Sequence, residues 1–312
     1  MIKKYMACIA CLLVLCCGCK ASAVQDKAKI TPYSRISEIC YLKQSFEIPG
    51  IELSSPQQIA SHDDILFICD SGNSRIIKCG LQGNVISEFG RQSSMTSNFI
   101  EPICIDVSSS QFCVYDRGSS KIQVLTLDGE PLWEYDLNEK FNFISDIIDV
   151  EICEDETVYF SLIAYGKHTG NSGIYSLKAG EIAKISSCTV GYLTSIENDI
   201  YFMSKYELED DNNWISGYAE MLRITENGLE RISAFSDSYS ASGIDVFDGK
   251  LYTYNYCSQS VEVFSTDGRY ISTEFAEPVV NDFVYRGFCA DKYGNLYLSD
   301  SVGNTIYKLV RE

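Results

Sequence analysis

The chain has 312 residues, of which 46% are hydrophobic, and its formal net charge is −18 at pH 7. The length and apolar content suffice for a large core, whereas the acidic balance repels phosphate backbones and anionic lipid headgroups. The composition therefore argues against nucleic-acid binding and against a domain that adheres to membranes through its own surface charge.

Residues 1–19 have the features of a secretory signal. Lys3 and Lys4 form a positive start, and residues 9–15 form a short apolar run. This run is too short to span a bilayer, and no later run reaches the roughly 18 apolar residues of a spanning helix. We interpret residues 1–19 as a signal peptide.

The run CCGC at 16–19 resembles a bacterial lipobox, in which a small residue precedes the last cysteine. It departs from that pattern at Cys16, where leucine is usual. The resemblance implies that Cys19 is lipidated and becomes the first residue of an extracytoplasmic protein, anchored to the membrane of the cell envelope through this lipid alone. Ordinary cleavage after Ala21 or Ala23, with release of the protein, is the alternative.

Residues 20–35 form a polar stretch without apolar periodicity. We interpret them as a flexible tether and residues 36–312 as one folded domain. Removal of the signal peptide takes away two lysines and no acid, so the net charge changes from −18 to −20.

Strand-like runs then recur with a period of about 45 residues, which is typical of a propeller or a repeat array. In residues 65–90 an apolar run ends in Asp-Ser-Gly-Asn, a second run follows, and a glycine turn leads to a third run that ends in Phe-Gly. Related patterns occupy residues 112–135, 250–275 and 295–310, with weaker copies at 157–185 and 199–233. Aromatic and β-branched residues favour strands, and no ten-residue stretch has a helical period. The sequence predicts an all-β fold.

Five of the repeats contain a glycine that we expect to form the turn between the third and fourth strands, because a tight hairpin needs a positive φ. These glycines are Gly83, Gly129, Gly180, Gly228 and Gly268. The sixth repeat stops at Glu312, after its third strand, while the strand-like segment Ile36–Ile48 precedes the first repeat. We predict that this N-terminal strand completes the last blade and closes the ring, which removes open strand edges.

Residues 68–90, ICDSGNSRIIKCGLQGNVISEFG, resemble an NHL repeat in their aliphatic strand, their Asp-Ser-Gly-Asn turn, Arg-Ile and terminal Phe-Gly. Residues 89–108 are similar to the stretch that joins neighbouring blades in that family, with Ser and Thr in place of the usual glycines. The resemblance covers residues 48–312 and is strongest in repeats 1, 2 and 6. It implies a six-bladed β-propeller, a fold that recurs among bacterial lipoproteins.

Nine cysteines follow Cys19: Cys40, Cys69, Cys79, Cys104, Cys113, Cys153, Cys188, Cys257 and Cys289. The odd number argues against a disulfide framework, and the spacings match no zinc motif. Most of these cysteines fall at strand positions, so we interpret them as small buried hydrophobic residues. A disulfide between Cys104 and Cys113, across a short turn, is the alternative.

Four repeats end their second strand with an acid or an amide: Asp70, Asp116, Asn255 and Asp300. A ring of acids could hold a metal, but Asp and Asn commonly accept backbone N–H groups in tight turns, and we favour that structural role. We expect Arg75 and Lys121, on the following strands, to be solvated or paired with neighbouring acids.

The chain has two histidines, which cannot supply a histidine-rich catalytic site. We expect His62 to be exposed in a turn and His168 to lie in a loop. Six-bladed enzymes of the gluconolactonase or peptide-amidating lyase type bind a metal in the central channel, and four acids near inner strands could offer oxygen ligands to Ca²⁺: Glu101, Asp146, Asp149 and Asp282. No spacing singles these acids out, and we find no nucleophile elbow, P-loop or dinucleotide fingerprint. We expect no cofactor unless Ca²⁺ binds there.

Repeats 3 and 4 lack the Asp turn and carry insertions at 162–173 and 204–220 between their second and third strands. Loops on a repeat scaffold commonly carry recognition, and aromatic side chains often anchor a partner. The candidate ligand-binding residues are Tyr165, Lys167, Tyr206 and Trp214. A tryptophan packed onto its own blade and a solvated acidic loop are the alternatives.

These features favour a monomeric, membrane-anchored, extracytoplasmic module that binds a protein, peptide or glycan of basic or polyhydroxylated character. The alternative is a hydrolase or lyase that depends on a channel metal.

Overall fold

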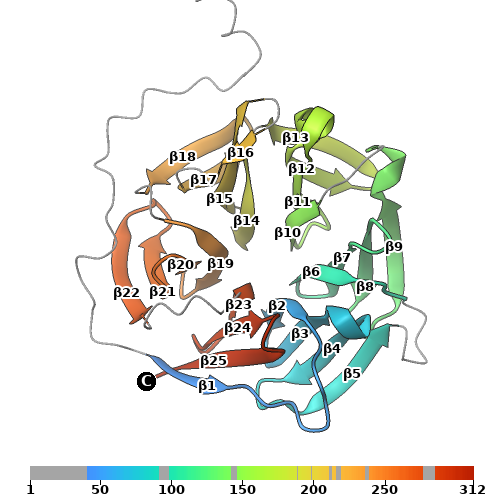
Figure 1. Cartoon of the computed structure of the whole chain (residues 1–312), viewed down its shortest axis with the longest axis vertical. Helices are drawn as coiled ribbons and strands as arrows, with labels where there is room; N and C mark the ends of the chain where they lie inside the picture. The colour runs from blue at the N-terminus through green and yellow to red at the C-terminus, as the bar shows by residue number, and fades with distance from the viewer. Residues whose placement is uncertain are drawn as a thin grey trace, which may run out of the picture.

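The computed structural model describes residues 41–90, 98–141, 146–187, 189–197, 199–210, 213–215, 219–235, 239–276 and 285–312, and no side chain is described at 166–167, 206–210 or 213–215. The described strands form six antiparallel sheets arranged as blades around a central channel (Figure 1). This is a six-bladed β-propeller, as predicted.

The strands follow one another from the channel outwards in each blade. Blade 1 contains β2 (Pro56–His62), β3 (Ile65–Asp70), β4 (Arg75–Gly80) and β5 (Val85–Gly90), and blade 2 contains β6 (Pro102–Val107), β7 (Gln111–Asp116), β8 (Lys121–Thr126) and β9 (Pro131–Asp136). Blade 3 contains β10 (Asp146–Ile152), β11 (Val158–Ile163), β12 (Gly173–Lys178) and β13 (Glu181–Ser187). Blade 4 contains β14 (Thr189–Ile196), β15 (Asp199–Asp210), β17 (Glu220–Thr225) and β18 (Gly228–Ala234), with β16 (Asn213–Ile215) paired to the extended end of β15. Blade 5 contains β19 (Ala241–Phe247), β20 (Lys250–Asn255), β21 (Ser260–Ser265) and β22 (Tyr270–Ala276).

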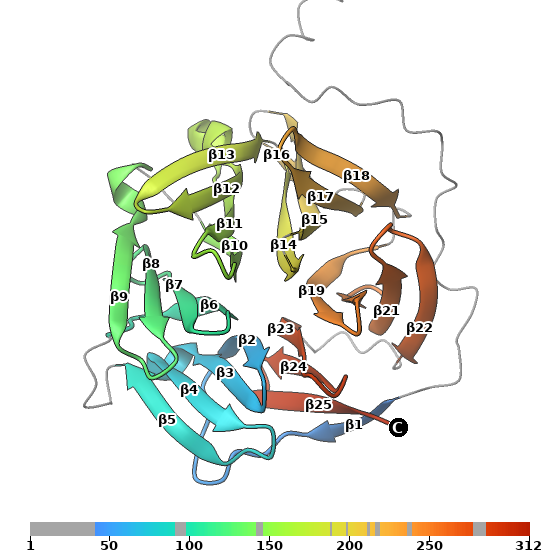
Figure 2. The same cartoon turned by 180° about the vertical axis from the view of Figure 1, so that it is seen from behind.

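Blade 6 combines the two ends of the described chain. β23 (Tyr285–Ala290), β24 (Leu296–Asp300) and β25 (Thr305–Arg311) come from the C-terminus, and β1 (Tyr41–Ser45) pairs antiparallel with β25 as the outermost strand. Figure 2 shows this junction from behind. The predicted closure by an N-terminal strand is confirmed for residues 41–45, while residues 36–40, the tether and Cys19 lie outside the described residues.

The antiparallel order gives the ring two distinct faces. The hairpin face carries the turns between first and second strands (residues 63–64, 108–110 and 248–249 among them) and those between third and fourth strands. The loop face carries the connections between second and third strands, including the 3-10 helices η2 (Ser71–Asn73) and η4 (Gly166–Asn171). A third short helix, η3 (Leu137–Glu139), follows blade 2.

All five predicted turn glycines have positive φ, from 77° at Gly268 to 108° at Gly228. Gly83 has the tightest surroundings of the five, because a Cβ there would lie 2.0 Å from the carbonyl oxygen of Glu47. In the described part of the chain no helix is long and apolar enough to cross a bilayer.

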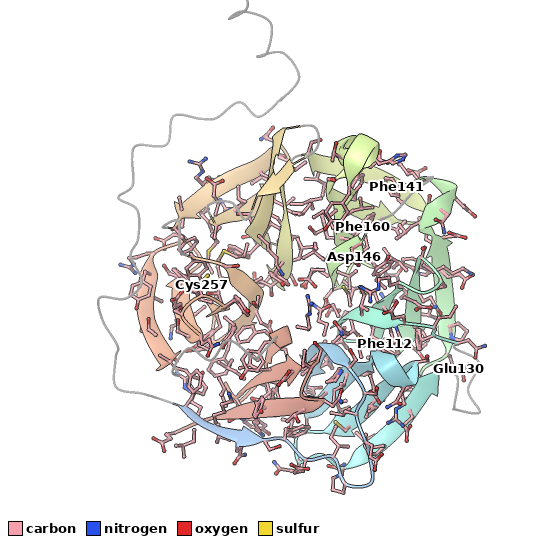
Figure 3. The ribbon with its side chains drawn as sticks, in the orientation of Figure 1. Phe112, Glu130, Phe141, Asp146, Phe160 and Cys257 are labelled. Atoms are coloured by element: carbon pink, nitrogen blue, oxygen red, sulfur yellow. The ribbon has the colours of Figure 1, made fainter. Side chains whose placement is uncertain are left out.

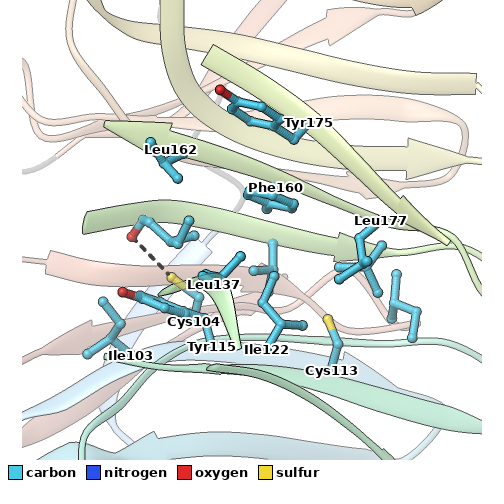
Figure 4. Packing of buried hydrophobic residues seen from close by; sticks show 14 of the residues in the cluster. Ile103, Cys104, Cys113, Tyr115, Ile122, Leu137, Phe160, Leu162, Tyr175 and Leu177 are labelled. Carbon is cyan, nitrogen blue, oxygen red and sulfur yellow. Dashed lines mark hydrogen bonds between the residues drawn. The ribbon is translucent and has the colours of Figure 1, made fainter. Parts of the chain in front are cut away.

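The core consists of side chains packed between neighbouring blades. Figure 4 shows Cys104, Tyr115, Phe160 and Tyr175 in one such cluster, formed by blades 2 and 3. Alternate residues of a strand point to opposite faces of its sheet, so a blade that is covered on both sides needs apolar residues at nearly every position. This requirement explains runs such as β3, in which five consecutive residues are buried.

The cysteines behave largely as expected. Cys69, Cys79, Cys104, Cys113 and Cys289 are buried free thiols, Cys153 is half-buried and Cys257 is exposed, whereas Cys40 and Cys188 lie outside the described residues. The alternative disulfide is absent because Cys104 is opposite Tyr115 and Cys113 is opposite Asp106 in the register of β6 and β7.

Candidate functional site

A cavity of about 720 Å³ lies at the centre of the ring. All six innermost strands contribute to its wall, and so do the turn residues Asp63, Ser108, Glu154 and Lys292. The cavity therefore follows the channel axis and reaches the hairpin face.

One position of the inner strand recurs in every blade and borders this cavity. The strand registers identify this position by its neighbour on the second strand. Ala60 lies opposite Phe67, Asp106 opposite Cys113, Glu151 opposite Tyr159, Thr194 opposite Tyr201, Asp245 opposite Tyr252 and Cys289 opposite Tyr297. Three of the six blades thus present a carboxyl group at the same level of the channel.

Two of these carboxylates, together with Asp149, join one blade to the next. Asp106 accepts the backbone N–H of Ile152 (2.8 Å), Asp149 that of Leu193 (2.8 Å) and Asp245 that of Ala290 (2.7 Å). The inner edge of each sheet has no further strand to pair with, so these carboxylates satisfy backbone groups that would otherwise be unpaired. Gln58 does the same with its amide oxygen, which accepts the N–H of Ile105 (2.8 Å), and its amide nitrogen donates to Asp149.

Glu151 differs from these three acids because its hydrogen-bond partner is the side chain of Ser195 and not a backbone N–H of the next blade. It is buried, with 7% of its surface exposed, and borders the cavity. Among these four inner-strand acids, Glu151 is therefore the one that does not bind a backbone N–H group of the next blade.

Enclosure in the channel raises the pKa of all four acids. Loss of water is the main cause in each case and brings the pKa of Asp149 to about 7 and that of Asp245 to about 6. Burial also raises the pKa values of Asp106 and Glu151. Repulsion by Asp245 and Asp149 raises the pKa of Asp106 further, and repulsion by Asp106 raises that of Glu151. A cation entering the cavity would favour the charged forms of these groups.

The predicted channel acids separate into different places. Asp149 is buried on the inner strand β10 beside the cavity, where it contacts Leu193 and Gln58, but it is not among the residues that line the cavity. Glu101 and Asp146 lie towards the loop face, where Arg117 donates to Glu101 and approaches Asp146 at 3.6 Å; Figure 3 shows Asp146 at the inner margin of its blade. Asp282 lies outside the described residues.

The sequence analysis missed Asp106, Glu151 and Asp245. A signal was present, because each of these acids lies between two β-branched residues near the end of an inner strand: Ile105 and Val107, Val150 and Ile152, Ile244 and Val246. An acid between two aliphatic residues at the same repeat position in three blades indicates a shared place at the inner edge of the ring.

The second-strand acids confirm their predicted structural role. Asp116 accepts the backbone N–H groups of Ile100 (3.1 Å) and Glu101 (2.6 Å), and Asp70 accepts that of Ser54 (2.7 Å). Asn255 and Asp300 accept N–H groups of the turns that follow them. No group of three or more His, Cys, Asp or Glu side chains is placed to hold a metal ion in the described ranges.

Arg75 and Lys121 are paired with acids, as expected. Arg75 contacts Asp70 (2.7 Å) and Glu88 (2.6 Å) with only 12% of its side chain exposed, and Lys121 contacts Glu134 at 2.5 Å.

The prediction for His62 is wrong. This residue ends β2 and lines the cavity mouth with 28% of its side chain exposed, 3.6 Å from Asp63. The inner strand extends to His62, so its ring is held at the channel and does not project from the turn.

Of the four candidate ligand-binding residues, only Tyr165 has a described side chain, and it is not among the residues that line the cavity. Tyr165 is 51% exposed at the start of η4. The side chains of Lys167, Tyr206 and Trp214 lie outside the described residues, so the predicted patch is not tested.

No family model and no curated protein matches this sequence. Solved structures do resemble it. A gluconolactonase from Xanthomonas campestris has a TM-score of 0.63 at 13% identity, over 87% of this chain and 90% of its own. A virginiamycin B lyase from Staphylococcus aureus has a TM-score of 0.56 at 13% identity, over 87% of this chain and 100% of its own. A PQQ-bound aldose sugar dehydrogenase from Streptomyces coelicolor has a TM-score of 0.58 at 12% identity, over 90% of this chain and 100% of its own.

These similarities place the chain among six-bladed β-propellers. Identities this low show a shared fold and no more.

Proposed function

We propose that this protein is a lipid-anchored binding module of the cell envelope, and that its central cavity receives a basic side chain of a peptide or protein partner. The anchor would be Cys19, with the propeller outside the cytoplasm. The relation to NHL repeats is part of this proposal and rests on the motifs of blades 1, 2 and 6.

The acidic wall of the cavity is the observation that carries the proposal. Eight carboxyl residues line it: Asp63, Asp106, Glu151, Glu154, Glu197, Asp245, Asp248 and Asp291. Lys292 is the one lysine in this lining, and Asp64 already pairs with it at 2.7 Å. A cleft with one sign of charge and a low-dielectric wall concentrates ions of the opposite sign.

The acidic residues line the cavity at two depths, and this arrangement suits an extended basic side chain. The outer level consists of turn residues such as Glu154 and Asp248, and the inner level of Asp106, Glu151 and Asp245. Glu154 follows Glu151, and Asp248 follows Asp245, by three residues, which corresponds to at most about 10 Å of chain. A lysine or arginine side chain could therefore pass the outer acids with its stem and bring its charged end to Glu151.

A fluorescein-labelled trilysine peptide, titrated with protein and followed by anisotropy, tests the proposal. We expect trilysine to bind more tightly than triglutamate and to lose affinity as salt rises, because exposed charges are screened. Glu151→Gln should weaken trilysine binding by about tenfold, as expected for the loss of one close charge pair. Glu139→Gln, an equal loss of charge on η3 away from the cavity, is the matched control. Equal binding of the two peptides, or equal affinity of the Glu151→Gln variant and wild type, would contradict the proposal.

A metal-dependent hydrolase or lyase remains the second candidate, since solved relatives in fold include a lactonase and a lyase. The residues present do not fit such a metal: the channel carboxylates of Asp106, Asp149 and Asp245 already accept backbone N–H groups, and the described residues contain no cluster at ligand spacing. We therefore derive no catalytic step through a metal.

A further inference from the structure

A second cavity, of about 870 Å³, lies between blades 3 and 4 at the hairpin face. Blade 3 contributes Tyr159, Ser176 and Ile185 to its wall. Blade 4 contributes Ile200, Ile224 and the turn at 225–228. We call this space the blade 3–4 cleft.

The blade 4 hairpin beside the cleft does not pack closely against its neighbour, and the blade 3 hairpin is open in the same way, since a Cβ at Gly180 would meet nothing within 4 Å. At three other seams the turn glycine of a blade is in close contact with the preceding blade or the closing segment: a Cβ would lie 2.0 Å from Glu47 at Gly83, 2.3 Å from Phe89 at Gly129 and 2.6 Å from Ile232 at Gly268. At Gly228 a Cβ would meet nothing within 4 Å. The blade 4 hairpin therefore stands away from β13, and the seam is open at its outer end.

Two pairs of cross-strand neighbours, one in blade 3 and one in blade 4, lie on the two sides of this opening. Tyr159 is opposite Ser176 on β11 and β12, and Ile200 is opposite Ile224 on β15 and β17. Tyr159, Ile185, Ile200 and Ile224 belong to one apolar cluster. The cleft thus has an apolar floor that includes a half-buried phenol ring.

The rest of the lining contains uncharged polar groups and four charged residues, Lys184, Asp199, Arg223 and Glu226. Within the described residues, the Tyr159 hydroxyl, the Ser176 hydroxyl and the Asn227 side-chain amide have no protein hydrogen-bond partner. The charged residues at the rim are largely engaged elsewhere: Arg223 pairs with Glu230 (2.7 Å), and Lys184 donates to the carbonyl oxygen of Gly170 (2.8 Å). Burial raises the pKa of Tyr159, so its hydroxyl keeps its proton and can donate it to a hydrogen bond.

We propose that the blade 3–4 cleft is a binding site for a neutral saccharide. One face of a pyranose ring is rich in C–H groups and packs on aromatic and aliphatic side chains, here Tyr159, Ile200 and Ile224. Its hydroxyls need uncharged donors and acceptors, which Tyr159, Ser176 and Asn227 supply. The cleft differs in this respect from the central cavity, whose acidic wall suits cations.

This site is independent of the function proposed for the channel. Saccharide binding in the cleft can fail while trilysine still binds in the cavity, and the reverse also holds.

Saturation-transfer difference NMR with cellobiose, maltose, xylobiose and N,N′-diacetylchitobiose, each at millimolar concentration, tests the proposal. We expect transfer to at least one of these sugars, strongest at ring C–H protons. Ser176→Trp fills the cleft and should weaken the binding at least about tenfold, the size expected for loss of a pocket. Tyr159→Phe and Asn227→Ala each remove one hydrogen-bonding group and should weaken it by roughly threefold to tenfold.

Asn227 lies on an exposed turn, so its variant keeps the test valid even if the tryptophan variant does not fold. Glu139→Gln, on η3 in another part of the ring, is the control and should bind as wild type does. The proposal is overturned if none of the four sugars shows transfer. It is equally overturned if transfer persists at wild-type affinity in the folded Ser176→Trp and Asn227→Ala variants.

Discussion

At the scale of single residues, carboxylates in this propeller have two kinds of surroundings. Those at the end of the second strand, such as Asp116, are fixed by backbone N–H groups of the segment that enters the same blade. Those of the inner strand, such as Asp149, hold the next blade and also border or approach the channel. The same side-chain type therefore fixes loops at one level and joins blades at another.

Asp116 gives a direct test of the first role. Asp116→Ala removes a fully buried carboxylate and leaves two partly buried N–H groups without this acceptor, so we expect a loss of about 2 kcal/mol in the free energy of unfolding. Asp116→Asn keeps an amide oxygen, as Asn255 does naturally in blade 5, and should lose clearly less. Urea unfolding of the three proteins makes the comparison, and equal losses in both variants would show that the hydrogen bonds are not the cause.

Glu151 gives a test of the raised pKa values in the channel. A carboxyl group whose pKa is higher in the folded than in the unfolded state stabilises the fold at low pH, and this contribution is lost as pH rises through the folded pKa. Wild type should therefore lose stability between about pH 4.5 and pH 8 through its channel acids. Glu151→Gln removes one such group, so the variant should match wild type near pH 4.5 and exceed it at pH 8, as measured by urea unfolding. A difference that does not change with pH would contradict the raised pKa.

At the scale of elements, the closing strand β1 can be tested by two neighbouring residues. Tyr41 is 2% exposed and donates its hydroxyl to the carbonyl oxygen of Gly294 (2.9 Å), whereas Leu42 is 59% exposed. Tyr41→Ala should cost about 3 kcal/mol, as typical for loss of a buried aromatic side chain, and Leu42→Ala less than about 0.5 kcal/mol. Thermal melting of both variants checks this. If both changes have the same small effect, β1 does not stabilise the ring.

Part of this arrangement of strands could be predicted from the sequence. The repeat period, the turn glycines and the missing fourth strand of the last repeat predicted the blades and their closure, because turn geometry and edge pairing are local or topological requirements. The level at which inner-strand side chains meet was not predicted. Asp106, Glu151 and Asp245 come from three blades, and their encounter depends on strand registers and on the curvature of the ring, which no local pattern encodes. His62 was misjudged for a related reason, since a one-residue extension of β2 decides whether its ring projects from the turn or faces the channel.

At the scale of the whole molecule, the thiols report on how the ring is stabilised. Five of the described cysteines are buried and free, and Cys257 is exposed. A thiol reagent should therefore modify Cys257 rapidly in the native protein, and it should modify the buried cysteines only after unfolding. Reducing agent should leave the melting temperature unchanged. A large drop on reduction would reveal disulfides and contradict the view that packing between blades holds the ring.

Anchoring is likewise a property of the whole chain. Cys19→Ala should abolish fatty-acid labelling and move the protein from the membrane fraction to the soluble one, because the acidic domain offers no attraction to anionic lipids. Membrane retention of this variant would contradict lipidation at Cys19.

We propose that the acids on the cavity wall form a binding site for a cation, and proton release on binding tests this proposal most directly. A cation that enters the cavity stabilises ionised carboxylates and lowers their pKa values, so groups such as Asp106, whose pKa burial raises to about 7, must give up protons. Calorimetric titration of trilysine at pH 7, repeated in buffers of different ionisation enthalpy, measures this release. We predict a net release of protons in wild type and a smaller release in Glu151→Gln. Binding without proton release, or no binding of trilysine at low salt, would contradict the claim.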